Sequence, residues 1–297
     1  MDHKTFGKIV AALRREQVSF LSGHNWIQRD LARETGLTLR IVGRIERGTQ
    51  ARLDGEVLQK LADSFELTSL ERREFFAMAS EVMDGEIVRR DLCDEAVFKD
   101  VWELLEELCV PAFITDPFSD FIGANRCFLA FHALDLAVLH NVKAEFGSIN
   151  NVALILSTET PMRQMLGHSW RPIALTNVQQ WRVTTMRYRH TLRFRKVMSS
   201  LSICPEFRVL WAEHNEHERA IDDCSRLRKC VYTHGMHGSV AYTVLTNASL
   251  TTYGDLYLSA FVPQTPATMN LFQELATKHT GAIPLTPWPT TSLTMPE

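Results

Sequence analysis

The 297-residue sequence contains few cysteines, no long apolar segment and no excess of positive charge. Its six cysteines include no CxxC pair, and this usage favours reduced thiols in a cytoplasm over a disulfide framework. No apolar run approaches the roughly 20 residues that a membrane helix needs, and the charged N-terminus lacks the apolar core of an export signal. We therefore expect a cytoplasmic protein without a membrane partner.

The motifs that usually carry catalysis are also missing. The sequence contains no phosphate-binding glycine loop, no nucleophile elbow and no HExxH zinc motif. Asp116 and Asp120 lie in a predicted turn, where a pair of carboxylates is more often structural than catalytic. We therefore predict that the protein is not an enzyme, and we assign no catalytic residues.

Positive charge is concentrated in one short region. The whole chain has a net charge of −3, which would be unusual for a protein coated in nucleic acid. Residues 28–52, however, carry six arginines against three acidic residues. A local basic patch of this kind is typical of a small DNA-reading module within a larger protein.

The same region has the pattern of a helix-turn-helix. Small and apolar residues recur at helical spacing on both sides of one glycine, at Leu31, Ala32, Leu37, Val42 and Ile45. Gly36 tolerates the positive φ of a tight turn, and Ala32 is small enough to let a second helix cross closely over it. An ordinary helical hairpin with a charged face is the alternative interpretation.

The second helix of this pair would leave Gly43 and several basic residues facing outward, where arginines can read bases in the major groove. Gln28 would lie at the start of the preceding helix, capped by Asn25, with its amide near a DNA phosphate. The predicted DNA-binding residues are Gln28, Arg29, Thr38, Leu39, Arg40, Arg44 and Arg47.

Residues 6–79 resemble the five-helix DNA-binding domain of the xenobiotic-response-element class of regulators, the Cro and lambda-repressor type. The resemblance rests on the fourth-helix text VLQKLADSFEL and on Gln28, Ala32, Gly36, Val42, Ile45, Glu46 and Gly48. It implies phosphate contacts near Gln28 and base contacts in the second helix of the pair. Thr68 and Glu71 have the spacing of a capping box that starts a fifth helix.

The C-terminal part mixes short strands with helices. PAFITD and FIGAN predict a hairpin that leads into a helix at Asn125, and Pro161 suits the first turn of a short helix. Residues 170–201 predict one long helix that is apolar on two faces, so it is buried or closes over a cavity. Three β-prone runs, at residues 227–232, 239–247 and 255–262, and a last helix at 266–278 follow.

Residues from about 100 to 265 are similar to the MmyB-like ligand-binding domain of bacterial regulators. The matching text is PAFITD…GAN, NN-x8-TPMRQMLGHSW and CPEFRVLWAEH. The resemblance implies a PAS-like antiparallel sheet with helices that enclose an apolar cavity. It also implies an effector that is fatty-acid-like or another apolar small molecule. We predict no cofactor, apart from a fatty acid bound as the effector.

We therefore predict a multidomain protein with α and α+β parts. A helix-turn-helix domain should occupy residues 1–80, a linker 81–97, a PAS-like ligand-binding domain 98–280 and an extended tail 281–297. With 45% hydrophobic residues, both domains can form their own cores.

Aromatic residues of the long helix and of the segment after it are candidates for the cavity wall, and basic residues between them could hold a carboxylate. Each aromatic residue could equally be ordinary core. The predicted ligand-binding residues are Trp170, Trp181, Arg182, Tyr188, His190, Arg193, Phe194, Phe207 and Trp211.

Histidine and cysteine also gather near residue 224, but their spacing matches no closed zinc module, so we predict no metal site. The cluster comprises His214, His217, Cys224, Cys230, His234 and His237.

The resulting prediction is a bacterial transcription regulator that binds operator DNA and a small apolar ligand. We expect a homodimer, because one recognition helix covers only a half-site. A metal- or redox-responsive regulator and a ligand-free protein-interaction regulator are the alternatives.

Overall fold

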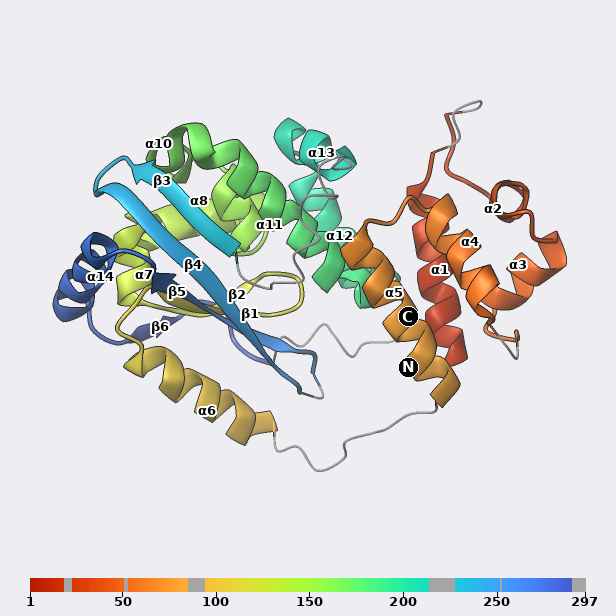
Figure 1. Ribbon diagram of the computed structural model, residues 1–297, viewed down its shortest axis with the longest axis horizontal. Coiled ribbons are helices and arrows are strands. Elements are labelled where there is room, and N and C mark those ends of the chain that lie inside the picture. Colours follow the sequence, from red (N-terminus) through yellow and green to blue (C-terminus); the bar gives the residue numbers. More distant parts are fainter. Residues whose placement is uncertain (19–22, 51–52, 85–93, 214–227, 252, 290–297) are drawn as a thin grey trace. The chain divides into compact units, whose positions relative to one another are not determined.

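The computed structural model of the chain (Figure 1) describes residues 1–18, 23–50, 53–84, 94–213, 228–251 and 253–289. By their contacts, these residues form two units. The first unit contains residues 1–84 and 182–195, and the second contains 94–181, 196–213 and the described residues from 228 onward. The helical stretch that begins at Trp170 therefore contributes residues to both units.

The first unit is built from helices α1 (His3–Glu16), α2 (Gln28–Thr35), α3 (Leu39–Glu46), α4 (Gly55–Ser64) and α5 (Ser69–Asp84). Side chains of Asp2 and Asp54 cap α1 and α4, and Thr68 and Glu71 form the predicted capping box at the start of α5. One face of each helix is buried in a common core that includes Phe6, Leu31, Ile45, Leu61 and Phe75.

Helices α1 and α3 approach closely where Gly7 faces the end of α3. A Cβ atom at Gly7 would lie 2.4 Å from the carbonyl oxygen of Ile45 and 2.6 Å from that of Glu46. Only a residue without a side chain fits this crossing.

The predicted long helix over residues 170–201 is interrupted. Helix α11 (Trp170–Thr184) ends, a short 3-10 turn η2 (Met186–Tyr188) follows, and α12 (Leu192–Leu201) starts anew. The hydroxyl of Thr191 accepts the backbone N–H of Phe194 and so stabilises the new start. The break lets Met186 enter the core of the first unit, where it is completely buried. The prediction of one continuous helix was wrong because local periodicity does not show that Met186 packs in the core of another unit.

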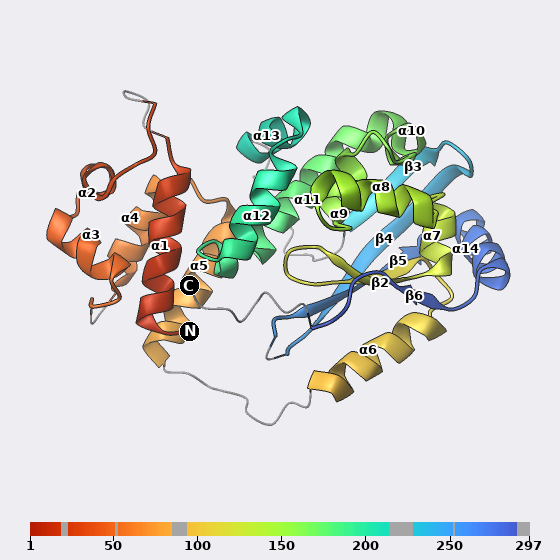
Figure 2. The same ribbon diagram turned by 180° about the vertical axis from the view of Figure 1, so that it is seen from behind.

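The second unit contains one six-stranded antiparallel sheet in the order β3-β4-β5-β1-β2-β6 (Figures 1 and 2). The strands are β1 (Ala112–Thr115), β2 (Phe121–Asn125), β3 (Arg228–His234), β4 (Gly238–Ser249), β5 (Leu256–Pro263) and β6 (Ala282–Pro284). The predicted fold class is thus confirmed: a helical N-terminal region and an antiparallel sheet with helices. The finer likeness to PAS domains stays a prediction.

Helices cover both faces of this sheet. On one face, Val101 and Leu105 of α6 (Asp94–Glu107) pack on Ile114 and Ile122. On the other face, rings of Phe113, Phe128 and Phe261 form an aromatic layer. The helices of this second face include α7 (Arg126–Phe131), α9 (Asn151–Leu156), α10 (Met162–Leu166), the first part of α11, and α14 (Pro266–Lys278).

The described part of the second unit also includes α8 (Leu136–Phe146), which the sequence did not suggest, residues 196–201 of α12, and α13 (Pro205–Ala212). The predicted helix start at Asn125 is confirmed, because its Oδ1 accepts the N–H of Phe128 at 2.9 Å. None of the described helices is long and apolar enough to cross a membrane.

The predicted extended tail begins as part of the sheet. Strand β6 pairs with β2, and the ring of Trp288 stacks on Phe98 with 5.0 Å between ring centroids. Pairing and stacking tie residues 282–288 to the second unit, so this part of the tail belongs to the ligand-binding part of the fold. Residues 290–297 lie outside the described residues.

Candidate nucleic-acid interface and ligand cavity

The turn between α2 and α3 has the geometry that the sequence predicts. Gly36 has a φ of 67°, in the left-handed region that favours glycine. The hydroxyl of Thr35 donates to the carbonyl of Leu31 at 2.6 Å and accepts the N–H of Leu37 at 3.3 Å. Helix α2, this turn and α3 therefore form a helix-turn-helix.

The outward face of α3 begins at its N-cap residue. The hydroxyl of Thr38 accepts the N–H of Ile41 at 3.3 Å and so caps the first turn of α3. The side chains of Arg40 and Arg47 are exposed, and Leu39 is 49% exposed. A short helix with an exposed arginine near each end can enter a DNA major groove.

Two residues of this face differ in detail from the expectation. Gly43 is buried rather than exposed, because the guanidinium of Arg47 lies over it, 3.1 Å from the position of a Cβ atom. Arg44 is partly buried, and its guanidinium donates to the carbonyl of Thr49 at 3.4 Å. Arg44 thus lies closer to the body of the unit than Arg40 does.

The start of α2 is held by a chain of polar contacts. Gln28 donates through Nε2 to one carboxylate oxygen of Glu46 at 2.8 Å, and Nε of Arg14 donates to the other at 2.6 Å. The predicted cap at Asn25 is wrong: Ile27 holds the N-cap position, and its N–H donates to the carboxylate of Asp30 at 2.9 Å. These bonds fix the first turn of α2 against the end of α3.

Three of the seven predicted DNA-binding residues, Gln28, Arg29 and Leu39, lie together at the beginnings of α2 and α3. A shallow depression with a volume of about 380 Å³ brings the beginnings of the two helices together, with Arg29 at its exposed rim. Its lining residues are Arg14, Ile27, Gln28, Arg29 and Leu39. Backbone N–H groups and arginines at such a place can bind phosphate.

The second unit contains a cavity of about 160 Å³ between the sheet and helices α7, α9, α10 and α11. Its walls are mainly aromatic and aliphatic, and they come from residues distant in sequence. The lining residues are Phe113, Phe128, His132, Asn151, Ile155, Met162, Leu166, Pro172, Ile173, Thr176, Asn177, Lys229, Cys230, Tyr242, Val244 and Phe261. Such walls suit an apolar small molecule.

The buried polar groups of this cavity are uncharged near neutral pH. Burial, together with the neighbouring His234 and His237, lowers the pKa of His132 to about 3. Burial also raises the pKa of the Tyr242 hydroxyl well above its usual value. The lining residue with a formal charge is Lys229, whose side chain is exposed. An anionic group of a ligand would therefore be placed at the rim, not in the interior.

None of the nine residues predicted from the sequence to bind the ligand lies among the described lining residues. Trp170 and Trp181 use their indole N–H groups structurally, donating to the carbonyls of Ile155 at 2.8 Å and Phe118 at 2.7 Å. Trp181, which is completely buried, also contacts the rings of Phe207 and Trp211. Trp170, Trp181 and Phe207 are core residues of the second unit, and Trp211 packs on Trp181 while it is partly exposed.

The other five predicted residues, Arg182, Tyr188, His190, Arg193 and Phe194, belong to the first unit. Arg182 lies in the last turn of α11, and the other four residues follow the break after Thr184. The residues that do line the cavity, such as His132 and Lys229, were missed by the sequence analysis. The local signal for His132 is a polar residue within an apolar segment, and Lys229 has no comparable signal because it follows Arg226 and Arg228.

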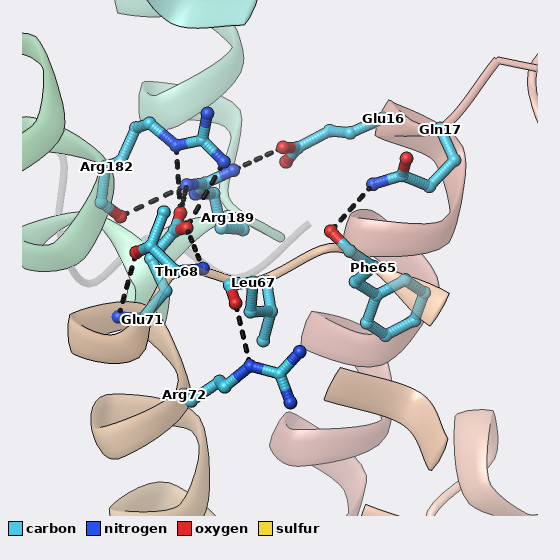
Figure 3. Close-up of polar contacts among 9 residues, drawn as sticks. All are labelled: Glu16, Gln17, Phe65, Leu67, Thr68, Glu71, Arg72, Arg182 and Arg189. Carbon is cyan, nitrogen blue, oxygen red and sulfur yellow. Dashed lines mark hydrogen bonds and ion pairs between the residues drawn. The ribbon is translucent and has the colours of Figure 1, made fainter. Parts of the chain in front are cut away.

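Residues 182–195 join the first unit through buried charges (Figure 3). Arg182 forms two bonds with the carboxylate of Glu71, at 2.9 Å and 3.2 Å. Arg189 lies beside Arg182. One of its guanidinium nitrogens lies 3.5 Å from the carboxylate of Glu71 and also donates to the carbonyl of Arg182 at 3.1 Å. A second guanidinium nitrogen donates to the carboxylate of Glu16. Farther along, Arg187 pairs with Glu74 at 2.5 Å.

The ionisation of this cluster follows from its burial. Glu71 is 1% exposed, and burial alone would raise its pKa, but the guanidinium groups of Arg182 and Arg189 lower the pKa below the usual value of 4.5. Burial raises the pKa of Glu16, although the guanidinium groups of Arg189 and Arg182 act in the opposite direction. A buried bidentate pair of this kind is costly to break, because the remaining partner stays charged and buried.

The histidine and cysteine cluster has a structural role where it is described. His214, His217 and Cys224 lie outside the described residues. His234 is buried and satisfied: Nδ1 accepts the N–H groups of Met236 and His237, and Nε2 therefore donates to the carbonyl of Phe131 at 3.1 Å. Among the residues that the structure describes, no three metal-binding side chains are grouped around a common point.

The helix-turn-helix with its arginine-bearing face, followed by a sheet domain with an apolar cavity, defines a DNA-binding regulator with a ligand-binding domain. Two family models match the chain, the helix-turn-helix at residues 23–72 and the MmyB-like transcription regulator ligand binding domain at residues 98–275. The second match covers more than half of the chain, so the protein belongs to this family. A search of curated proteins finds no match.

Proposed function

We propose that this regulator changes its affinity for operator DNA when an apolar small molecule occupies the cavity of the second unit. The observation that carries the proposal is the cavity itself, whose walls come from Phe113, Phe128, Ile155 and Phe261 on four different elements. An apolar ligand removes these walls from water, and its binding free energy becomes more favourable by roughly 25 cal/mol for each Å² of apolar surface that is buried.

The effector that we propose is fatty-acid-like, as the family resemblance implies. Its carboxylate would pair with Lys229 at the rim, and its apolar part would enter the cavity. This assignment replaces Arg182, His190 and Arg193, because those residues belong to the first unit. A cavity of about 160 Å³ encloses only a short or bent chain, so we expect affinity to peak below the length of common membrane acyl chains.

Helix α11 supports a route from the cavity to the DNA-binding unit. Its residues Ile173 and Thr176 line the cavity, and Arg182, about two turns later on the same helix, bonds to Glu71 of the first unit. A ligand that moves α11 would therefore act on the charge cluster. The effector must bind one arrangement of this helix better than the other for the equilibrium to shift.

We also propose that the protein acts as a homodimer. One α3 helix reads only a few base pairs, and two-fold operators match two-fold proteins. Analytical ultracentrifugation of the full chain, alone and with selected DNA, tests this part of the proposal. A monomer that binds a single half-site in both measurements would contradict it.

The function is tested by selecting operator DNA with the purified full chain and then measuring its affinity with octanoate, decanoate and myristate. Thr176→Trp places a large ring at the cavity mouth from an exposed position of α11. Gln180→Trp, one turn later on the same helix and outside the lining, is the matched control. We expect a fatty acid to change operator affinity at least fivefold in the wild type and the control, but not in Thr176→Trp.

The position of the carboxylate has a separate test. Lys229→Met keeps the stem of the side chain and removes its charge, while Lys143→Met does the same at an exposed site outside the cavity. Loss of fatty-acid affinity in Lys229→Met alone supports the rim assignment. Operator affinity that no acyl chain alters, together with an effect of metal chelation or oxidation, would instead favour a metal- or redox-responsive regulator.

A further inference from the structure

His132 is the buried polar residue of the cavity whose hydrogen bonding is incomplete. It ends α7, is 3% exposed and lines the cavity. Rings of Phe128 and Phe131 lie 4.8 Å from its own ring centroid, and Phe261 lies at 5.8 Å. These contacts hold the imidazole in one place within an apolar wall.

The Nδ1 atom of His132 is buried and has no hydrogen-bond partner among the described residues. A buried polar atom left in this state costs about 1–3 kcal/mol. The neighbouring His234 shows the contrast, because both of its ring nitrogens bond to the backbone. His237 also has an unpartnered ring nitrogen within the described part of the chain, but it does not line the cavity.

Other polar groups of the cavity wall already have partners. Asn151 donates to Asn177 at 3.0 Å, Thr176 donates to the carbonyl of Pro172 at 2.9 Å, and the hydroxyl of Tyr242 lies 3.5 Å from that of Tyr232. Among the described lining residues, His132 therefore has a ring nitrogen with no existing hydrogen bond to break. Because Nδ1 itself has almost no accessible surface, the imidazole must turn about its Cβ–Cγ bond to present this atom to a ligand.

We propose that His132 recognises an uncharged oxygen, a hydroxyl or a carbonyl, within the apolar part of the effector. This inference rests on the proposed function and refines its ligand class. The imidazole is neutral, since burial and the nearby His234 and His237 lower its pKa to about 3. A neutral ring can donate to a carbonyl or exchange a hydrogen bond with a hydroxyl, but it supplies no charge for a carboxylate.

The size of the cavity further restricts the class of effector. An apolar cavity of roughly 150 Å³ accommodates a molecule of the size of benzene, and the cavity here measures about 160 Å³. The enclosed part of the effector thus has the size of one ring or a short branched chain, and it carries the oxygen. A longer chain or a carboxylate would extend to the rim near Lys229.

Two pairs of probes of nearly equal shape test this inference on the full chain by calorimetry. The first pair is p-cresol and p-xylene, which differ by a hydroxyl in place of a methyl group, and the second is acetophenone and isopropylbenzene. We expect the oxygen-bearing member of at least one pair to bind about tenfold more tightly, as one hydrogen bond to a buried group allows. The pair that shows the preference distinguishes a hydroxyl from a carbonyl.

Variants of His132 assign the preference to this residue. His132→Leu removes the polar atom, and His132→Asn keeps a polar atom near the place of Nδ1. The preference should fall to less than twofold in His132→Leu and should be largely retained in His132→Asn and in the control His237→Leu. Imidazole nitrogen NMR of the wild type provides a measurement that does not depend on a variant, since Nδ1 of His132 should shift with p-cresol and not with p-xylene.

Equal binding of both members in each pair, or a preference that persists in His132→Leu, would overturn the role of His132 while leaving the cavity as a ligand site. If no member of either pair binds and no fatty acid changes operator affinity, both this inference and the proposed function are wrong.

Discussion

Two buried histidines of the second unit illustrate how single residues serve different purposes. His234 closes the turn between β3 and β4 through its backbone bonds, whereas His132 lines the cavity and has a buried Nδ1 without a hydrogen-bond partner among the described residues. Both are neutral in the folded state, because burial lowers the pKa of His234 to about 4 and that of His132 to about 3.

The lowered pKa values of these two histidines predict that the protein loses stability in acid. The unfolded chain binds a proton on each histidine below its usual pKa of 6.5, and the folded chain does not, so stability falls as the pH decreases from 6.5 toward 3. Each histidine contributes roughly 1.4 kcal/mol per pH unit within its window. Thermal unfolding of His132→Leu should therefore depend less steeply on pH than that of the wild type. Parallel curves for the two proteins would contradict the neutral, buried state of His132.

At the DNA-binding face, individual side chains should divide into those that read bases and those that contact phosphate. We expect Arg40→Ala and Arg44→Ala each to reduce the preference for operator over random DNA by roughly 1–3 kcal/mol. Gln28→Ala should weaken binding to both DNAs alike. Fluorescence anisotropy with both DNAs measures the difference, and Arg33→Ala, on the exposed side of α2, is the control. Unchanged preference in the arginine variants would mean that another face of α3 meets the bases.

Substitution of Gly7 should lower the stability of the protein through steric overlap alone. Gly7→Ala would place a methyl group 2.4 Å from the carbonyl oxygen of Ile45, so α1 and α3 must separate. We expect a loss of about 1–3 kcal/mol in unfolding free energy, as for other overpacked sites. Gly55→Ala is the matched control, because no atom lies within 4 Å of the position that its methyl group would take. Equal stability of the two variants in denaturant unfolding would show that the helices adjust without cost.

At the scale of elements, α11 and the residues after it serve both units. The charge cluster around Glu71 should stabilise the first unit above pH 4.5 and lose this contribution as the pH falls through the lowered pKa of Glu71. Glu71→Gln should cost about 3 kcal/mol near neutral pH, since Arg182 stays buried and charged without its carboxylate.

The difference between wild type and Glu71→Gln should shrink in acid, where the wild-type carboxylate is itself protonated. Glu56→Gln, which breaks the exposed pair with Lys60, should cost well under 1 kcal/mol. Urea unfolding at several pH values gives both comparisons. A loss in Glu71→Gln that is no larger than that of the surface variant would show that the buried cluster does not stabilise the fold.

At the scale of the whole molecule, the DNA-binding unit is not a continuous stretch of chain. Met186 completes its core, and Arg182 and Arg189 neutralise its buried acid. A fragment of residues 1–90 should therefore exchange its amide hydrogens in α1 and α5 faster than the full chain does. In the full chain, Met186→Ala should destabilise the first unit by roughly 2–5 kcal/mol. Identical exchange in fragment and full chain would show that residues 182–195 are dispensable.

The sequence by itself determined the helix-turn-helix and most of the strands. In both cases the information is local: Gly36 supplies the turn, apolar residues at helical spacing supply the buried faces, and Asn125 caps the helix that follows β2. Local patterns of this kind decide where an element begins and which face is buried.

Only the tertiary structure decided what each buried face packs against. Trp181 and Met186 are both apolar residues of one helical stretch, yet the first lies in the core of the second unit and the second in the core of the first. The cavity is likewise formed by strands and helices that are far apart in the chain. His132 and Lys229 therefore line the same cavity although they share no sequence pattern. Burial energy depends on area and not on the identity of the neighbour, and periodicity therefore cannot distinguish a core wall from a ligand site.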